Sequence, residues 1–186
     1  MRVLDNHRLD GVDWRPSPHF EPRPAGVAPE LIVLHCVSLP ENEFGTGAPM
    51  RLFQGQLDVT EHPTFADLQG LRVSPHVFID RTGHVNQLVS FDHQAWHAGL
   101  SSWRHRPGCN PYSIGIELEG SVHQGYAEAQ YVNLLHCLRA LLAFYPNLSV
   151  ERVVGHADIA PGRKQDPGPH FDWLRVLQGL SQLSGE

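Results

Sequence analysis

Two kinds of hydrophobic periodicity occur along this chain, and together they restrict it to a mixed α/β fold. Residues 113–119 (SIGIELE) alternate between apolar and other residues, which predicts a half-buried β-strand. Over residues 127–145 apolar side chains instead recur every three and four positions, which predicts one amphipathic helix that ends before Pro146. We therefore expect a single α/β domain with a central mixed sheet flanked by helices.

Shorter patterns fill in the rest of this expected domain. Residues 31–37 (LIVLHCV) predict a buried strand, 152–155 a short strand, and 171–180 a final helix. Two apolar segments on either side of Arg-Thr-Gly predict a β-hairpin, and three stretches rich in Gly, Pro or polar residues predict loops, the first of them with short helical turns. The hairpin strands are 76–80 and 85–89, and the loops are 38–75, 92–112 and 157–170.

The chain of 186 residues is long enough for one domain with a sizeable core. Five prolines in residues 1–29 predict an extended arm packed on a globular body at 30–186. The net charge of -6 and the lack of any basic run argue against nucleic acid or an anionic membrane as partner. The N-terminus has no apolar signal segment, and three widely spaced cysteines suit reduced thiols, so we expect a cytoplasmic protein.

Histidine is unusually frequent, with 13 residues against 14 lysines and arginines. His35 lies in the first predicted strand, His156 directly follows the 152–155 strand, and Asp166 follows in the next loop. Two imidazoles and one carboxylate leave a zinc ion one open coordination position, which is typical of a catalytic site. The alternative is that these are hydrogen-bonded structural residues, and their spacing alone does not decide between the two interpretations.

Longer motifs give a more specific indication, because they occur in order over nearly the whole chain. They resemble the N-acetylmuramoyl-L-alanine amidase family, shared with phage amidases and peptidoglycan-recognition proteins, and above all its cytoplasmic members that act on anhydro-muropeptides. The segments that carry the resemblance are VLHCVSLP, EFG, RVSPHVFIDRTG, QAWHAG, CNPYSIGIELEG and GHADIAPGRKQDPGPHFDW.

The resemblance implies a role for individual residues when it is carried over position by position. It makes His35, His156 and Asp166 the ligands of a zinc cofactor, Glu117 the catalytic carboxylate, and Lys164 a residue beside the scissile carbonyl. Alternation by itself does not choose between Glu117 and Glu119, which project to the same strand face. The implied reaction is hydrolysis of the amide between N-acetylmuramic acid and L-alanine, with Glu117 accepting a proton from water.

Three residues are candidates for substrate contacts. Trp96 offers an aromatic wall for sugar or peptide, although a core tryptophan fits equally well. Arg72 is able to pair with a stem-peptide carboxylate, or is a solvated surface residue. His97, next to Trp96, is the third candidate, or else orients its loop. The chain departs from the family pattern at Cys36, Pro75 and residues 104–108, which leaves the peptide contacts open.

The resemblance predicts a monomeric cytoplasmic enzyme that acts on soluble anhydro-muropeptides during peptidoglycan recycling. In that family, loss of this activity can induce β-lactamase expression. Two alternatives remain at this point. One is a periplasmic or phage-type amidase that degrades intact cell wall, and the other is a non-catalytic peptidoglycan-binding module.

Overall fold

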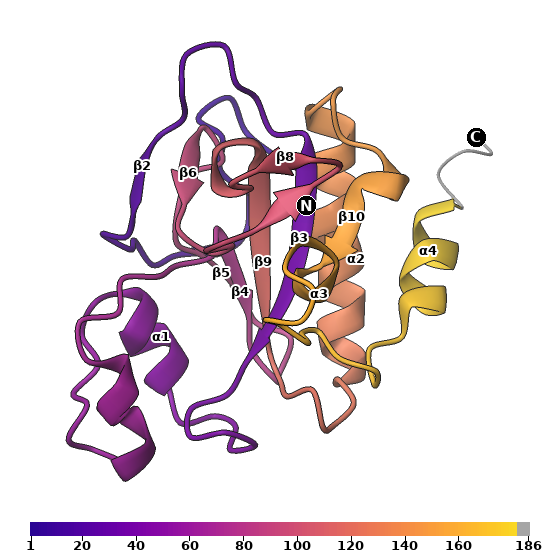
Figure 1. Ribbon diagram of the computed structural model, residues 1–186. Helices are drawn as coiled ribbons and strands as arrows, with labels where there is room; N and C mark the ends of the chain where they lie inside the picture. Colours follow the sequence, from indigo (N-terminus) through magenta and orange to yellow (C-terminus); the bar gives the residue numbers. More distant parts are fainter. Residues whose placement is uncertain (182–186) are drawn as a thin grey trace.

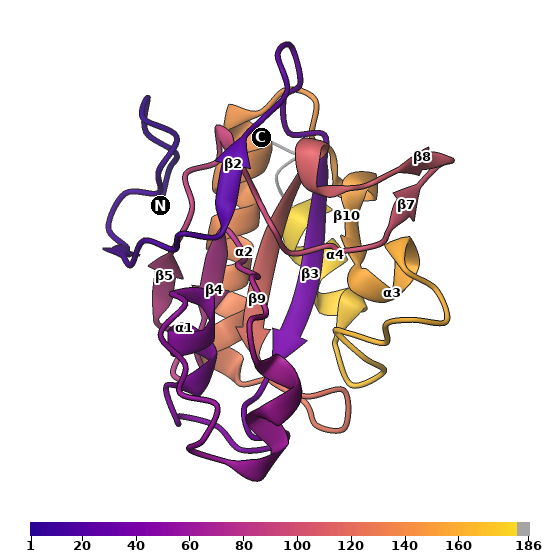
Figure 2. The same cartoon turned by 60° about the vertical axis from the view of Figure 1, so that its left-hand side comes forward.

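A six-stranded mixed sheet forms the centre of the protein, which we describe from a computed structural model (Figures 1 and 2). The structure describes residues 1–181, so the end of the expected 30–186 domain, residues 182–186, lies outside the described part. The order β1-β5-β4-β9-β3-β10, with helices beside the sheet, confirms the predicted single α/β domain. The strands are β1 (Asp13–Trp14), β3 (Leu31–Val37), β4 (Val77–Ile79), β5 (Val85–Gln87), β9 (Ser113–Glu119) and β10 (Val153–Gly155).

The strand directions bring the candidate residues to one edge of the sheet. Strands β4, β9, β3 and β10 run parallel to one another, whereas β5 pairs with β4 as the predicted antiparallel hairpin. The register of β3 and β9 places His35 opposite Glu117, and β10 ends at Gly155, directly before His156. The carboxyl ends of parallel strands in α/β sheets are where ligands usually bind.

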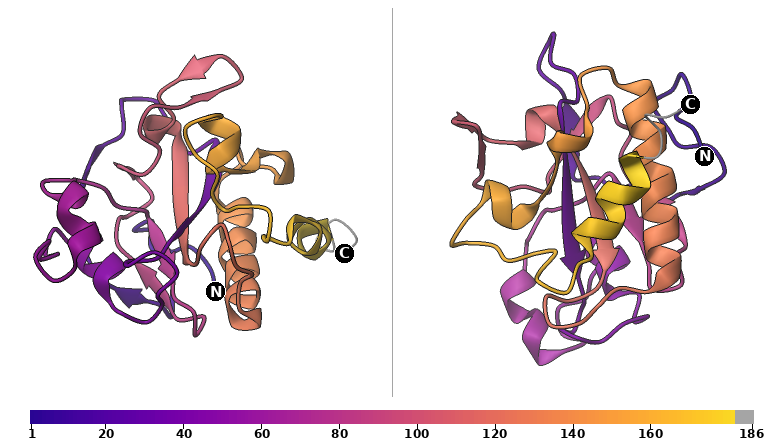
Figure 3. Two further views of the ribbon diagram at one scale, coloured as in Figure 1. Left: turned by 60° about the horizontal axis from the view of Figure 1, so that its bottom comes forward. Right: turned by 90° about the vertical axis from the view of Figure 1, so that its right-hand side faces the viewer.

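Helix α2 (Glu128–Phe144) covers one face of the sheet, as the helical periodicity predicted. Its apolar stripe packs on the inward side chains of β9 and β3, and α4 (Trp173–Ser181) lies beside it (Figure 3). The buried Gln130 side chain of α2 donates hydrogen bonds to the backbone carbonyls of Ile79 and Glu119, at 3.2 and 2.9 Å. The buried apolar residues of α2 and of this sheet face form the main core of the protein.

Loops and short elements cover the opposite face, so the prediction of a half-buried β9 is wrong: both faces of the strand are enclosed. The expected short helical turns of 38–75 are present as α1 (Ala48–Phe53) and η1 (Pro63–Leu68). The loops predicted at 92–112 and 157–170 also contain regular structure, which was too short to give a periodic signal. These elements are β6 (His93–Ala95), β7 (Ser102–Trp103), β8 (Arg106–Pro107), η2 (Asn110–Tyr112) and α3 (His156–Ile159), while η3 (Val150–Arg152) precedes β10.

The N-terminal segment 1–29 runs along the body of the domain (Figure 2). Its strand β1 adds to the sheet edge beside β5, and β2 (Phe20–Pro22) pairs with β6. Val3 and Leu9 are buried in the main core. The Arg23 guanidinium donates to the backbone carbonyls of Phe91, Pro111 and Ser113. These contacts attach the segment firmly to the domain, while a boundary at residue 29 remains a prediction.

Candidate active site

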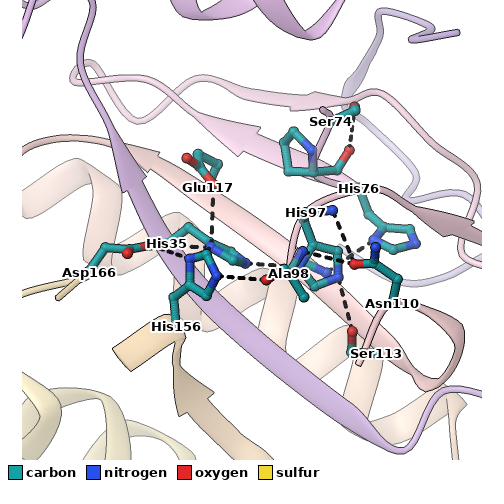
Figure 4. Close-up of polar contacts among 12 residues, drawn as sticks. His35, Ser74, His76, His97, Ala98, Asn110, Ser113, Glu117, His156 and Asp166 are labelled. Carbon is teal, nitrogen blue, oxygen red and sulfur yellow. Dashed lines mark hydrogen bonds and ion pairs between the residues drawn. The ribbon is translucent and has the colours of Figure 1, made fainter. Parts of the chain in front are cut away.

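Three side chains that are distant in the sequence converge at the carboxyl edge of the sheet (Figure 4). His35 comes from β3, His156 begins α3, and Asp166 lies in the loop that follows α3. The Nδ1 atoms of the two imidazoles are 2.9 Å apart, and Asp166 Oδ2 lies 3.0 Å from His156 Nδ1 and 3.2 Å from His35 Nδ1. Two nitrogens and one carboxylate oxygen thus point at a common position.

Glu117 stands next to this cluster on the adjacent strand, with Oε2 3.9 Å from His35 Nδ1. Glu119 lies on the same face of β9, but its carboxylate accepts hydrogen bonds from the backbone N–H groups of Gly45 and Arg81, at 2.6 and 3.0 Å. The structure therefore separates the two glutamates that alternation left equivalent. Glu117 faces the cluster, and Glu119 holds two loops against the end of the strand.

The cluster lies in a cavity of about 370 Å³. Its polar lining includes the three clustered residues together with Glu117 and the exposed Lys164. Its apolar lining includes Val37, Leu52, Phe53, Leu71, Val73 and Pro75. Such a cavity, apolar with a few converging polar groups, is the usual form of a site for a small substrate.

Burial has a strong effect on the protonation states of the polar residues that line the cavity. It lowers the pKa of His35 to about 4, so this imidazole is neutral near pH 7. Burial also raises the pKa of Glu117 well above its ordinary value, and the negative charge of Asp166 adds to that rise. For Asp166 burial acts in the same direction, but the close contacts of its carboxylate with His156 and His35 outweigh it and hold its pKa below the ordinary value. The two carboxyl groups thus differ strongly in acidity.

The predicted substrate residues have different positions. Arg72 and Trp96 contact each other, with the guanidinium carbon 4.8 Å from the ring centroid, and neither lines the cavity. Arg72 borders a second hollow of about 310 Å³, and Trp96 Nε1 donates to Glu21. His97 does line the cavity and is hydrogen-bonded to His35, with 2.9 Å between its Nδ1 and His35 Nε2. Their roles in binding substrate stay predictions.

Sequence reasoning missed the groups that surround the two clustered histidines. His156 Nε2 lies 3.0 Å from the carbonyl oxygen of Ala98, and Asn110 holds the backbone of residues 97 and 98. No local pattern marks such contacts, because they join residues far apart in the chain. Cys36 also borders the cavity, but burial raises the pKa of its thiol to about 12, which keeps it protonated. A protonated thiol is a poor metal ligand.

Comparison with known proteins agrees with this fold. The N-acetylmuramoyl-L-alanine amidase family matches residues 25–169, most of the chain. The chain therefore belongs to this family of enzymes, which hydrolyse an amide bond.

Individual relatives show which members of the family the chain is similar to. The chain is 47% identical over 173 residues to the 1,6-anhydro-N-acetylmuramyl-L-alanine amidase AmpD of Escherichia coli, covering 93% of this chain and 94% of that protein. A crystal structure of an AmpD derivative superposes with a TM-score of 0.92 at 46% identity, covering 95% of this chain and 98% of the other. The amidase AmiD from E. coli, in complex with anhydro-N-acetylmuramic acid-L-Ala-D-gamma-Glu-L-Lys, gives a TM-score of 0.61 at 30% identity, covering 84% and 60%.

Among residues 1–181, no helix has the length and apolar character needed to cross a membrane.

Proposed function

We propose that this protein uses a zinc ion to hydrolyse the amide between anhydro-N-acetylmuramic acid and L-alanine in soluble muropeptides, during peptidoglycan recycling. One observation carries the proposal: two imidazoles and a carboxylate converge beside a second carboxyl group of raised pKa, inside a cavity. The high identity to AmpD over nearly all of both chains supports the choice of substrate.

The donor atoms of His35, His156 and Asp166 fit a zinc ion. Their mutual distances of 2.9 to 3.2 Å come close to the separation of about 3.3 Å between ligand atoms of a tetrahedral zinc site. Two unprotonated imidazole nitrogens facing each other repel unless a proton or a cation lies between them. A zinc ion bound there supplies Lewis-acid activation of the scissile amide and of the attacking water.

Glu117 is suited to transfer the proton. Its raised pKa brings the carboxyl group closer to neutrality, where one group is able both to accept and to donate a proton. In the proposed reaction Glu117 takes a proton from water as the water oxygen bonds to the carbonyl carbon. The carbon–nitrogen bond then breaks, and the proton passes to the departing amine nitrogen of L-alanine, leaving a carboxyl group on the muramic acid.

Lys164 contributes a positive charge at the rim of the same cavity. Its ammonium group is exposed, and its charge opposes the rise in the pKa of Glu117, so it acts electrostatically on the site. We propose that it stabilises the negative oxygen that develops on the attacked carbonyl. The apolar residues that line the same cavity would exclude water and strengthen this interaction.

The peptide and the sugar also have to be placed. AmiD binds an anhydro-muropeptide substrate, and we propose a ligand of the same class in the cavity described here. Arg72 and Trp96 lie beyond the cavity, and we propose that they contact the distal part of the stem peptide. We further propose that the enzyme acts as a monomer in the cytoplasm, where anhydro-muropeptides are recycled.

A side-by-side assay tests the proposal against the wall-lytic alternative. The protein is incubated with anhydro-muropeptide, with muropeptide carrying a reducing end, and with intact sacculi, each with zinc or with a chelator. We expect fast, zinc-dependent release of peptide from the first substrate only. Activity that survives full removal of metal would refute the zinc mechanism, and preferred cleavage of sacculi would favour a wall-lytic enzyme.

A further inference from the structure

The remote nitrogens of both clustered imidazoles are held by two consecutive residues (Figure 4). His35 Nε2 lies 2.9 Å from the Nδ1 atom of His97, and His156 Nε2 lies 3.0 Å from the carbonyl oxygen of Ala98. Both imidazoles thereby turn their Nδ1 atoms toward Asp166. The dipeptide His97–Ala98 thus orients the two rings at the same time.

The contact with Ala98 fixes the proton of His156. A carbonyl oxygen only accepts hydrogen bonds, so the proton must sit on Nε2, and Nδ1 keeps a free lone pair. The Arg163 guanidinium nitrogen Nη2 lies nearby, but it donates to the carbonyls of Ala98 and Leu100 at 2.8 and 2.7 Å, which uses both of its protons. It therefore has no proton left to donate to His156 Nε2, from which it lies 3.3 Å.

A second chain of hydrogen bonds serves His35. When Nε2 of His35 carries the proton, it donates to His97 Nδ1, and His97 Nε2 then donates to the hydroxyl of Ser113 at 3.0 Å. The ring of His97 packs directly over Gly115, where an added Cβ would come within 2.3 Å of its Cγ. This close fit leaves the imidazole of His97 little freedom to turn.

Asn110 holds this dipeptide in place, although it touches neither clustered histidine. Its Oδ1 atom accepts hydrogen bonds from the backbone N–H groups of His97 and Ala98, at 3.2 and 2.8 Å. The backbone of Asn110 is itself fixed by the guanidinium of Arg23, which donates to its carbonyl oxygen at 3.2 Å. One side-chain oxygen therefore sets the positions of both partners of the imidazoles.

We propose that Asn110 is a positioning residue for the metal site: by holding His97 and Ala98, it keeps both ligand histidines in the tautomer and orientation that zinc requires. This inference rests on the proposed zinc function. Partners of metal-bound histidines generally affect metal affinity strongly, although they do not touch the ion.

The test measures zinc affinity by competition with a chromophoric chelator, together with the absorption spectrum of Co²⁺ bound in place of zinc. For Asn110→Ala we expect zinc affinity to fall about 10- to 100-fold, with a changed Co²⁺ spectrum. Asn110→Asp keeps an oxygen that accepts both N–H groups, and we expect it to retain affinity within about threefold of the parent protein. Asn110→Leu keeps a side chain of similar size without the acceptor oxygen, so it would bind zinc normally if residue 110 only filled space, whereas we expect it to lose affinity as Asn110→Ala does.

Asn133→Ala is the matched control, because Asn133 is also half-buried and its amide donates to a backbone carbonyl, that of Gly83 at 3.0 Å. We expect it to leave zinc affinity unchanged. If Asn110→Ala does not fold, the variant His97→Phe is measured in its place. This change keeps a ring over Gly115 but removes the acceptor for His35, and we expect the same loss of zinc affinity.

The outcomes separate this inference from the function on which it rests. If the parent protein binds zinc tightly and Asn110→Ala or its replacement binds equally well, the positioning role is wrong while the zinc site stands. The role is also wrong if Asn133→Ala weakens binding as much as Asn110→Ala. If the parent protein itself binds no zinc, the proposed function fails first.

Discussion

The two faces of strand β9 are both enclosed, yet they are built in different ways. The face toward α2 carries Ile114, Ile116 and Leu118 and packs against a single regular helix. The face toward the loops carries Gly115, Glu117 and Glu119 and is covered by separate loop segments, which hydrogen-bond to this face through Gly45, Arg81 and His76. The comparison teaches that one face supplies stability and register, whereas the other positions chemistry.

The largest effect that this comparison predicts is on the loop face, at the metal cluster. Asp166→Asn removes the anionic ligand with little change of shape, and we expect loss of bound zinc and a fall in turnover of about 10⁴-fold or more. Metal content and peptide release measure both. Asp158→Asn is the control, because Asp158 accepts a hydrogen bond from the Gly155 N–H group, which asparagine is also able to do. Equal activity of Asp166→Asn and the parent protein would contradict the assignment.

The next effect separates the two glutamates of that face. Glu117→Gln removes the proton acceptor, so we expect turnover to fall about 10²- to 10⁴-fold while bound zinc is retained. Steady-state kinetics and metal analysis provide the measurement.

Glu119→Gln is the matched partner of this variant. It weakens the hydrogen bonds to Gly45 and Arg81, so we expect a loss of about 1–2 kcal/mol in the free energy of unfolding and less than about tenfold in turnover. If Glu119→Gln lost as much turnover as Glu117→Gln, the two residues would not have separate roles.

On the face of β9 toward α2, a substitution should change the free energy of unfolding and leave zinc binding intact. Leu134 is fully buried against the sheet, and Leu134→Ala should lower the free energy of unfolding by about 2–5 kcal/mol because it leaves a cavity. Urea unfolding gives this value, and zinc binding of the folded protein should remain. Val132 is exposed on the same helix, so Val132→Ala should cost less than about 0.5 kcal/mol. Loss of zinc affinity in Leu134→Ala would show that the faces are coupled.

The last prediction concerns acid, to which the loop face should be sensitive. Burial, with the nearby charges of Arg23 and His93, lowers the pKa of His76 to about 3. Below pH 6.5 the unfolded chain therefore binds a proton that the folded protein does not, so stability is present above that pH and is lost as the pH falls toward 3. The contribution of one such group is about 1.4 kcal/mol per pH unit.

This acid prediction is measured by urea unfolding of metal-free protein at several values between about pH 7 and pH 4. His76→Gln keeps an acceptor for the Gly115 N–H group but does not titrate, and we expect a shallower dependence on pH. An unchanged slope would mean that His76 is not among the groups responsible.

The sequence by itself determined the regular part of this protein. Periodicity predicted β3, the β4–β5 hairpin and α2, because each depends on a local pattern of buried side chains. The short elements between 92 and 112 were missed, since β6 pairs with the distant β2 and η2 is only three residues long. The long motifs pointed to His35, His156 and Asp166, and these residues do come together.

Only the tertiary structure decided how the site is assembled. Glu117 and Glu119 are equivalent in strand alternation, and they differ because Gly45 and Arg81 reach one carboxylate and not the other. The orientation of the histidines likewise depends on Asn110, which is far from both in the sequence. Periodicity records which side chains avoid water, whereas a directional hydrogen bond is fixed only when distant segments are brought within about 3 Å.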